Sequence, residues 1–265
     1  MNDFAQFKER QKEGWKNFAP LAVGTTPAAA RLVQFAGISK GHRVLDVGCG
    51  TGVVAVTAAL SGAHVQAADL TPELLEHARE NARIAEVEIE WHEADVEQLP
   101  FRDGEFDVVV SQFAHIFAPR PAVAVSEMLR VLRPGGTIAF ATWPPELLVG
   151  RTMSLSARYS PPPPPGVAPP LLWGDPQTIT QRLGQAVTEL TFDRQALFIP
   201  ALTPRHFRMN IERAAGPVTR VVQSLVTTEP ERLEAFRREF DAAVGDYMED
   251  NLVRQDYLLT RARKV

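Results

Sequence analysis

Hydrophobic positions along the chain gather in short blocks that alternate with helical patterns, and this alternation predicts the elements of a core. Apolar runs of strand length stand at residues 43–47, 64–68, 87–92, 106–111 and 137–143. Helical patterns separate them at about residues 52–61, 72–84 and 121–132. Strands that alternate with helices predict a parallel sheet with crossover helices on both of its faces.

The two ends of the chain carry different patterns. Residues 1–36 predict a helical cap with breaks at glycine and proline, at Gly14, Pro20 and Gly24. The second half predicts two more strands with inserted helices, at about residues 187–199, 204–224, 229–248 and 253–263. We therefore expect four parts: the cap at 1–36, a core at 37–146, an insertion at 147–186 and C-terminal strands with inserted helices at 187–265.

The insertion contains a proline-rich stretch, SPPPPPGVAPP at residues 160–170. Such a sequence favours a stiff polyproline conformation without internal hydrogen bonds. We expect it to act as a rigid spacer that holds a lid, because it lies inside the connections of the fold. The alternative is a docking segment for an SH3 or WW module of a partner.

Composition excludes several classes of protein. Lys and Arg number 28 against 32 Asp and Glu, a net charge of -4, so no global basic field favours nucleic acid as a partner. The single cysteine, Cys49, excludes an intramolecular disulfide framework and a cysteine cluster for zinc, and no metal site is expected. The charged start and the lack of a long apolar run predict a cytoplasmic protein without a membrane span.

The motif VLDVGCGTG at residues 44–52 joins the end of a buried strand to a glycine turn. Glycines allow a tight turn and a close approach of the backbone to a ligand. A dinucleotide turn has the spacing G-x-G-x-x-G and holds a pyrophosphate, whereas position 53 here is Val. Asp46, just before the turn, would repel a pyrophosphate and attract an ammonium group. The motif therefore indicates an adenosine-containing cofactor with a positive charge, S-adenosylmethionine.

Two further carboxylates follow at the ends of later strands. Asp69 ends the second strand, where a carboxylate can accept both hydroxyls of a ribose, or can serve the start of the next helix. Asp95 leaves the third strand, where it can accept from an adenine amine while Val96 offers its backbone NH. Together with Asp46 they form a series at the edge where open α/β sheets bind ligands.

These motifs, together with FDVVVS at residues 106–111 and LRPGG at residues 132–136, resemble the class I S-adenosylmethionine-dependent methyltransferases. Within them the chain is similar to the small-molecule branch related to the ubiquinone and menaquinone C-methyltransferases. The resemblance covers residues 40–143 closely. It implies a Rossmann-like α/β fold, with a seven-stranded, mostly parallel sheet, an N-terminal helical cap and a proline-rich lid.

The resemblance also implies roles for single residues. Asp46 and the glycine turn, with Gly48 and Gly50, would hold the methionine moiety of the cofactor. Asp69, followed by Leu70, would hold the ribose. The adenine and the floor below the sulfonium would be lined by two pairs of residues, Asp95 with Val96 and Ser111 with Gln112.

Methyl transfer is an in-line displacement at an activated carbon, so an enzyme mainly aligns the nucleophile and excludes water. His115 is the candidate base, because it follows the fourth strand at the ligand edge and an unperturbed imidazole titrates near neutrality. The alternative is a histidine that packs among Phe113, Ile116 and Phe117. Trp15 is expected to fold over the cofactor, and Thr25 and Thr26 to bond its carboxylate.

The sequence thus predicts methyl transfer from S-adenosylmethionine to an O, N, S or C nucleophile of a small organic acceptor. Three alternatives stay open: a non-catalytic cofactor-binding or regulatory protein, a dinucleotide-dependent oxidoreductase, and a nucleic-acid methyltransferase. The sequence argues against the nucleic-acid methyltransferase. Base-modifying relatives carry an Asn or Asp, Pro, Pro and aromatic signature after the fourth strand, whereas this chain has Ser111-Gln112-Phe113-Ala114 there. The sequence leaves open whether the chain is a monomer or a homodimer.

Overall fold

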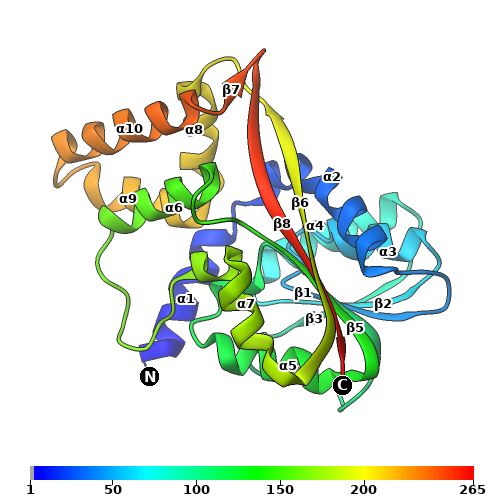
Figure 1. The fold of residues 1–265 in the computed structure, drawn as a ribbon. Coiled ribbons are helices and arrows are strands. Elements are labelled where there is room, and N and C mark those ends of the chain that lie inside the picture. Colours follow the sequence, from blue (N-terminus) through cyan, green and yellow to red (C-terminus); the bar gives the residue numbers. More distant parts are fainter. Residues whose placement is uncertain (1–2) are drawn as a thin grey trace.

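The predicted apolar runs become the strands of one twisted sheet in the computed structural model, which describes residues 3–265 (Figure 1). The strands are β1 (Arg43–Val47), β2 (His64–Asp69), β3 (Ile89–Glu93), β4 (Phe106–Gln112), β5 (Leu132–Thr142), β6 (Val187–Pro200), β7 (Met248–Glu249) and β8 (Leu252–Lys264). Their order is β3-β2-β1-β4-β5-β8-β6, and the short β7 pairs with β8. β1 to β5 are parallel, whereas β8 runs antiparallel to β5 and β6. The predicted α/β fold with a mostly parallel sheet is confirmed.

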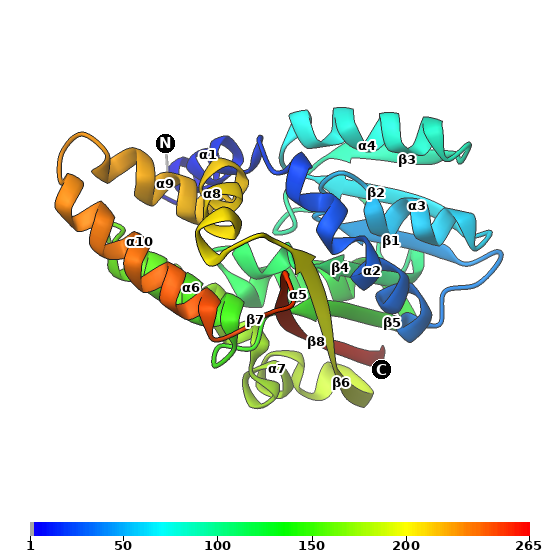
Figure 2. The same cartoon turned by 90° about the horizontal axis from the view of Figure 1, so that it is seen from above.

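Helices cover both faces of this sheet (Figure 2). They are α1 (Asp3–Trp15), α2 (Ala19–Ala36), α3 (Val53–Leu60), α4 (Pro72–Ile84), α5 (Pro121–Val131), α6 (Leu148–Arg158), α7 (Pro176–Leu183), α8 (Pro204–Ala214), α9 (Gly216–Leu225) and α10 (Pro230–Gly245). α2, α3 and α4 lie on one face, and α5 and α7 lie on the other. Among residues 3–265, no helix combines the length and the apolar character that crossing a bilayer requires.

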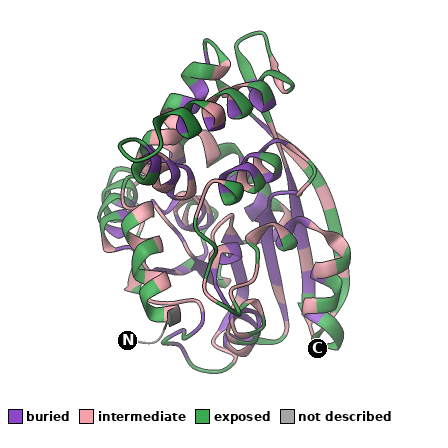
Figure 3. Cartoon of the chain, turned by 90° about the vertical axis from the view of Figure 1, so that its left-hand side faces the viewer, coloured by how far each residue is buried: buried purple, intermediate pink, exposed green. Residues whose placement is uncertain are grey.

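Two apolar cores stabilise the fold. The larger one fills the space between the sheet and its helices, where the strands are mostly buried (Figure 3). Strand residues such as Val44, Val109 and Ala139 are fully buried there. The second lies among α6, α8, α9 and α10, where Val221 and Phe236 are fully buried. These four helices form a unit beyond the ends of the parallel strands (Figures 1 and 2). Because the helical unit has its own core, it forms a wall that faces the ligand edge of the sheet.

Three boundaries differ from the prediction for local physical reasons. β5 begins at Leu132, because Leu132 already pairs with Phe106 of β4, and the register then shifts before Thr137 pairs with Val108. The helix expected over 204–224 is two helices, since Pro217 removes a backbone donor and disfavours helical geometry just before it. Conversely, α2 continues through Gly24, where a break was expected.

The proline-rich stretch is attached at both of its ends. Near its start the Ser160 hydroxyl donates to the Ser156 carbonyl at 2.8 Å, and near its end the Ala168 amide donates to the Pro119 carbonyl at 3.0 Å. It thereby connects the helical unit to the core. These contacts agree with a spacer, and the partner-docking alternative stays a prediction.

Candidate functional site

A cavity of about 980 Å³ lies between the ends of the parallel strands and the helical unit. Its volume is at the upper end of the range for ligand sites and leaves room for two small molecules. One part, the cofactor half, is formed by residues at and after the ends of β1, β2 and β3 and by the start of α3 and α4. The other part, the acceptor half, is formed by residues after β4 and β5, by β6, β8 and by the helical unit.

The glycine turn after β1 forms the floor of the cofactor half. Gly48, Gly50 and Gly52 all have positive φ angles, of 66°, 53° and 79°, which side chains rarely tolerate. A Cβ atom at Gly48 would also collide with the side chain of Ala114. The backbone therefore comes close to the cavity only because these positions lack side chains.

Asp46 is buried at the end of β1 with one oxygen unused. Its Oδ2 accepts a hydrogen bond from the Ala55 amide at 3.0 Å, whereas its Oδ1 has no partner within the described residues. Burial raises the pKa of this carboxyl to about 7. An unpartnered carboxylate oxygen next to a cavity is costly unless a ligand supplies a donor. This arrangement fits the ammonium group of S-adenosylmethionine.

Asp69 connects the end of β2 to both neighbouring loops. Its Oδ2 accepts from the Gly50 amide and its Oδ1 from the Thr71 amide, each at 2.8 Å. Burial raises the pKa of Asp69, and these two hydrogen bonds act in the opposite direction. Asp69 therefore serves the start of α4, which is the alternative role predicted for it. Its carboxylate still has lone pairs for ribose hydroxyls. The ribose role stays a prediction.

Asp95 has partners that the sequence did not reveal. Its Oδ1 accepts from the Glu97 amide at 2.9 Å, and its Oδ2 accepts from Lys8 of α1. Lys8 also contacts the fully buried Glu97 at 2.6 Å, and Lys12 contacts Glu93 at 2.7 Å. Lysines four residues apart on α1 thus face acids two residues apart at and after the end of β3, and this matching spacing was the missed signal.

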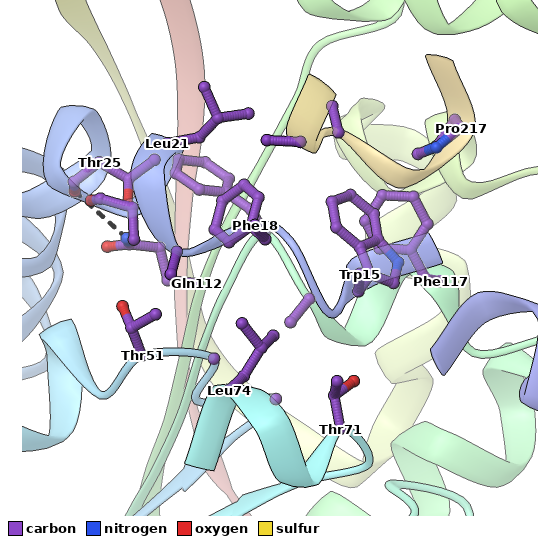
Figure 4. Close-up of a pocket in the computed structure, with 18 of the residues that line it drawn as sticks. Trp15, Phe18, Leu21, Thr25, Thr51, Thr71, Leu74, Gln112, Phe117 and Pro217 are labelled. Atoms are coloured by element: carbon purple, nitrogen blue, oxygen red, sulfur yellow. Dashed lines mark hydrogen bonds between the residues drawn. The ribbon is translucent and has the colours of Figure 1, made fainter. Parts of the chain in front are cut away.

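Most of the predicted cofactor residues line the cavity. Besides the three carboxylates these are Trp15, Gly48, Gly50, Leu70, Val96 and Gln112. Trp15 packs against Phe117 with ring centroids 4.9 Å apart, beside Pro217 (Figure 4). α1 therefore reaches over the strand ends, and its role as a cap stays a prediction.

Two predicted cofactor residues do not line the cavity. Thr26 is exposed, and its hydroxyl faces the Ala22 carbonyl, whereas Thr25, one position earlier, does line the cavity. Ser111 is fully buried and donates to the Val47 carbonyl at 2.7 Å, which holds β4 to the end of β1. In each predicted pair one residue lines the cavity and its neighbour does not, because successive residues of a helix or strand point in different directions.

Gln112 is the floor residue that does reach the cavity. Its Nε2 donates to the Thr25 carbonyl at 3.2 Å, which fixes the side chain (Figure 4). Its buried Oε1 has no partner within the described part of the chain. Together with Asp46 Oδ1, it leaves two unused acceptors at a site expected to hold a positively charged cofactor.

His115 borders the cavity, but its ring is enclosed by aromatic side chains. The ring is 1% exposed, with centroids 4.6 Å from Phe140 and 4.6 Å from Trp173, and neither ring nitrogen has a partner among the described residues. Burial, with the nearby Arg182 charge, lowers the pKa of His115 to about 3. The surroundings favour the packing alternative, and the base role stays a prediction.

The acceptor half is mainly aromatic and aliphatic. Phe113 and Trp143 stack with centroids 3.8 Å apart and an interplanar angle of 13°. Phe113 adopts a φ of 59°, an uncommon conformation for a bulky residue, which this packing stabilises. Further apolar side chains come from the helical unit and from β6, including Leu148, Met153, Phe207, Phe240 and Ile199. Sequence reasoning could not place these residues, because they meet only through tertiary packing.

Comparisons with known proteins agree with this geometry. A family model described as a methyltransferase domain matches residues 45–140. An uncharacterized protein of Mycobacterium tuberculosis is 36% identical over 239 residues, which cover 90% of this chain and 87% of that protein. The demethylmenaquinone methyltransferase of Clavibacter sepedonicus is 39% identical over 136 residues, about half of each chain (50% and 52%).

Solved structures share the fold. A candidate methyltransferase from Bacillus halodurans superimposes with a TM-score of 0.60 at 23% identity, covering 89% of this chain and 98% of that one. Phosphoethanolamine N-methyltransferase 2 of Haemonchus contortus, solved with S-adenosyl-L-methionine, has a TM-score of 0.55 at 18% identity, covering 90% and 52%. The sheet and the placement of its helices are therefore those of a methyltransferase fold.

We predict that cofactor affinity depends on pH through Asp46. With a pKa of about 7 in the free chain, Asp46 becomes protonated as the pH falls, and a cationic amine then loses its partner. Affinity for S-adenosylhomocysteine, measured by calorimetry, should fall about tenfold per pH unit well below pH 7. Asp46→Asn should weaken binding at pH 7.5 and remove this slope. Asp103→Asn, which changes an 82% exposed carboxylate outside the cavity, should leave the affinity at pH 7.5 and its dependence on pH unchanged. A pH-independent wild type would contradict the assignment.

We predict that His115 stays neutral from pH 5 to 8. Its folded pKa lies below that of an unfolded histidine, so its contribution to stability is present above about pH 6.5 and is lost as the pH falls toward 3. NMR titration should show no change of its ring signals between pH 5 and 8. His115→Phe should unfold in urea with a smaller loss of stability on acidification, whereas His115→Ala should cost about 3 kcal/mol by leaving a cavity. Titration of the ring near pH 6.5 would restore the base role.

Proposed function

The chain belongs to the class I S-adenosylmethionine-dependent methyltransferases, and on that premise we propose that its acceptor is a small organic molecule bound in the acceptor half of the cavity. The observation that carries the proposal is the division of one cavity into an acidic edge and an apolar chamber. The acidic edge suits a cationic methyl donor, and the adjoining chamber suits an apolar or planar acceptor.

The residues at the acidic edge would hold the cofactor. Asp46 Oδ1 and Gln112 Oε1 are free to accept from its amino group, and the glycine turn lets the chain approach its methionine moiety. Asp69 would accept from the ribose hydroxyls, and Asp95 with Val96 would border the adenine. When bound, the cofactor supplies a methyl group activated by a sulfonium.

The chain itself would then align the acceptor and exclude water. Trp15 and Phe18 of the N-terminal segment cover the cavity from one side (Figure 4). Phe113 and Trp143 also line the cavity. An enclosed apolar chamber keeps water from the reacting atoms and limits the orientations of the acceptor. Both effects raise the rate of an in-line displacement without a covalent intermediate.

Among the described residues that line the acceptor half, none is a carboxylate. With His115 buried and neutral, a strong general base is absent from the described lining of this half. The acceptor would therefore present a nucleophile that needs little help to lose a proton, at O, N, S or C. The name of the Clavibacter relative, a demethylmenaquinone methyltransferase, supports a planar acceptor of this kind.

A non-catalytic cofactor-binding protein is the alternative that the proposal must exclude. Both would bind S-adenosylmethionine at the strand ends, and only an enzyme would consume it. Monomer or homodimer, and a cytoplasmic location, stay predictions.

We predict that S-adenosylhomocysteine raises the melting temperature in a concentration-dependent way and that NAD does not. Asp69→Ala should keep the fold but weaken S-adenosylhomocysteine binding by about 10- to 100-fold, since it loses both the charge-assisted contact to the ribose and the hydrogen bond that holds the Gly50 amide. Mass spectrometry should detect methyl transfer to some member of a panel of phenols, amines, thiols and quinone precursors. Stabilisation by S-adenosylhomocysteine without turnover of any acceptor would favour the non-catalytic alternative, and stabilisation by NAD would contradict the family assignment.

A further inference from the structure

The charges that line the cavity are distributed unevenly. Among the described residues its carboxylates are Asp46, Asp69 and Asp95, and all three belong to the cofactor half. Its cations are three lysines of the N-terminal segment and one arginine of α8, namely Lys8, Lys12, Lys16 and Arg213. Each lysine forms an ion pair with an acid. Within residues 3–265, Arg213 has no ion-pair partner, so it is the unpaired charge of the acceptor half.

Arg213 lies in the last turn of α8, where the chain turns toward the N-terminal segment. The next residues, Ala215 and Pro217, also line the cavity, and the intervening Gly216 packs against the Trp15 ring. Arg213 is exposed as a residue although it lines the cavity, which places it at the opening of the acceptor half rather than in its apolar interior. A ligand could reach it without having to bury an unpaired charge.

A second polar group faces the cavity from the same side of α8. Asn210 precedes Arg213 by three residues, a spacing that places both side chains on one helical face. The Asn210 carboxamide has no hydrogen-bond partner in the described part of the chain. Phe207, one turn earlier, is buried among apolar residues. This face of α8 thus changes from apolar to polar along the cavity wall.

We propose that the methyl acceptor is an organic anion with an aromatic or aliphatic body, and that Arg213 and Asn210 bind its carboxylate. This inference rests on the proposed function and adds the chemical class of the acceptor. A guanidinium matches the planar geometry of a carboxylate, and the Asn210 amide supplies a further donor. The body of the acceptor packs between the Phe113–Trp143 stack and the helical unit.

The arrangement also orients the acceptor. Its carboxylate is attracted to Arg213 at the opening and repelled by Asp46 and Asp69 at the strand ends. The opposite end of the molecule, which carries the nucleophile, therefore points toward the cofactor. Arg213 and Asn210 act as specificity-determining residues, and neither one takes part in the transfer itself.

The experiment measures binding of carboxylates and of neutral analogues to the full chain saturated with S-adenosylhomocysteine. The probes are benzoate, phenylacetate and 2-naphthoate, each compared with its carboxamide by calorimetry. At least one acid should bind about tenfold more tightly than its amide, as expected for a charge-assisted contact, and this preference should weaken at high salt. Arg213→Gln should abolish the preference, and Arg213→Lys should retain part of it.

Arg205→Gln is the matched control, because Arg205 is an exposed arginine of the same helix that does not line the cavity. It should keep the preference of the wild type. Equal affinity for every acid and its amide, no binding of any acid, or a preference that survives in Arg213→Gln would overturn the inference. These results leave the proposed function in place as long as S-adenosylhomocysteine itself binds, whereas a flat titration with S-adenosylhomocysteine contradicts the proposed function.

Discussion

The hydrogen bond between the Gly50 amide and the Asp69 carboxylate sets the geometry on which the site depends. It ties the glycine turn after β1 to the end of β2, and the second Asp69 oxygen binds the Thr71 amide just before α4. The turn can lie this close because its glycines adopt positive φ angles. As the turn is fixed, Asp46 keeps one oxygen free beside the cavity, and the cofactor half takes its shape.

The acceptor half depends on a different part of the chain. The helical unit of α6, α8, α9 and α10 has a core of its own, so it presents a firm wall opposite the strand ends. α1 completes the enclosure through Lys8 and Lys12, which contact acids after and at the end of β3. The cavity therefore joins a charged edge built from local motifs to an apolar chamber built from distant segments. This combination lets one fold hold a fixed methyl donor and a variable acceptor.

Local chemistry determines how much of this could be predicted from the sequence. Strand periodicity, the glycine spacing and the strand-end carboxylates predicted the sheet and the cofactor edge, since each depends on neighbouring residues. The direction of single side chains was harder to predict than the elements that carry them. Thr25 lines the cavity and Thr26 does not, and Ser111 holds β4 to the end of β1. The Phe113–Trp143 stack joins segments far apart in the sequence, so no local pattern indicates it. For the Lys8 contacts the sequence offers only the matching spacing of the lysines and the acids, and it does not show that the two segments meet.

We propose that Asp46 and Asp69 position a cationic methyl donor whose reactive end faces the apolar chamber. A crystal structure of the complex with S-adenosylhomocysteine would show this arrangement. We expect the amino group of the ligand within hydrogen-bond distance of Asp46 Oδ1, the ribose hydroxyls at Asp69, and the sulfur directed toward Phe113 and Trp143. A ligand bound outside this cavity, or bound with its amino group away from Asp46, would rule out this mode of binding.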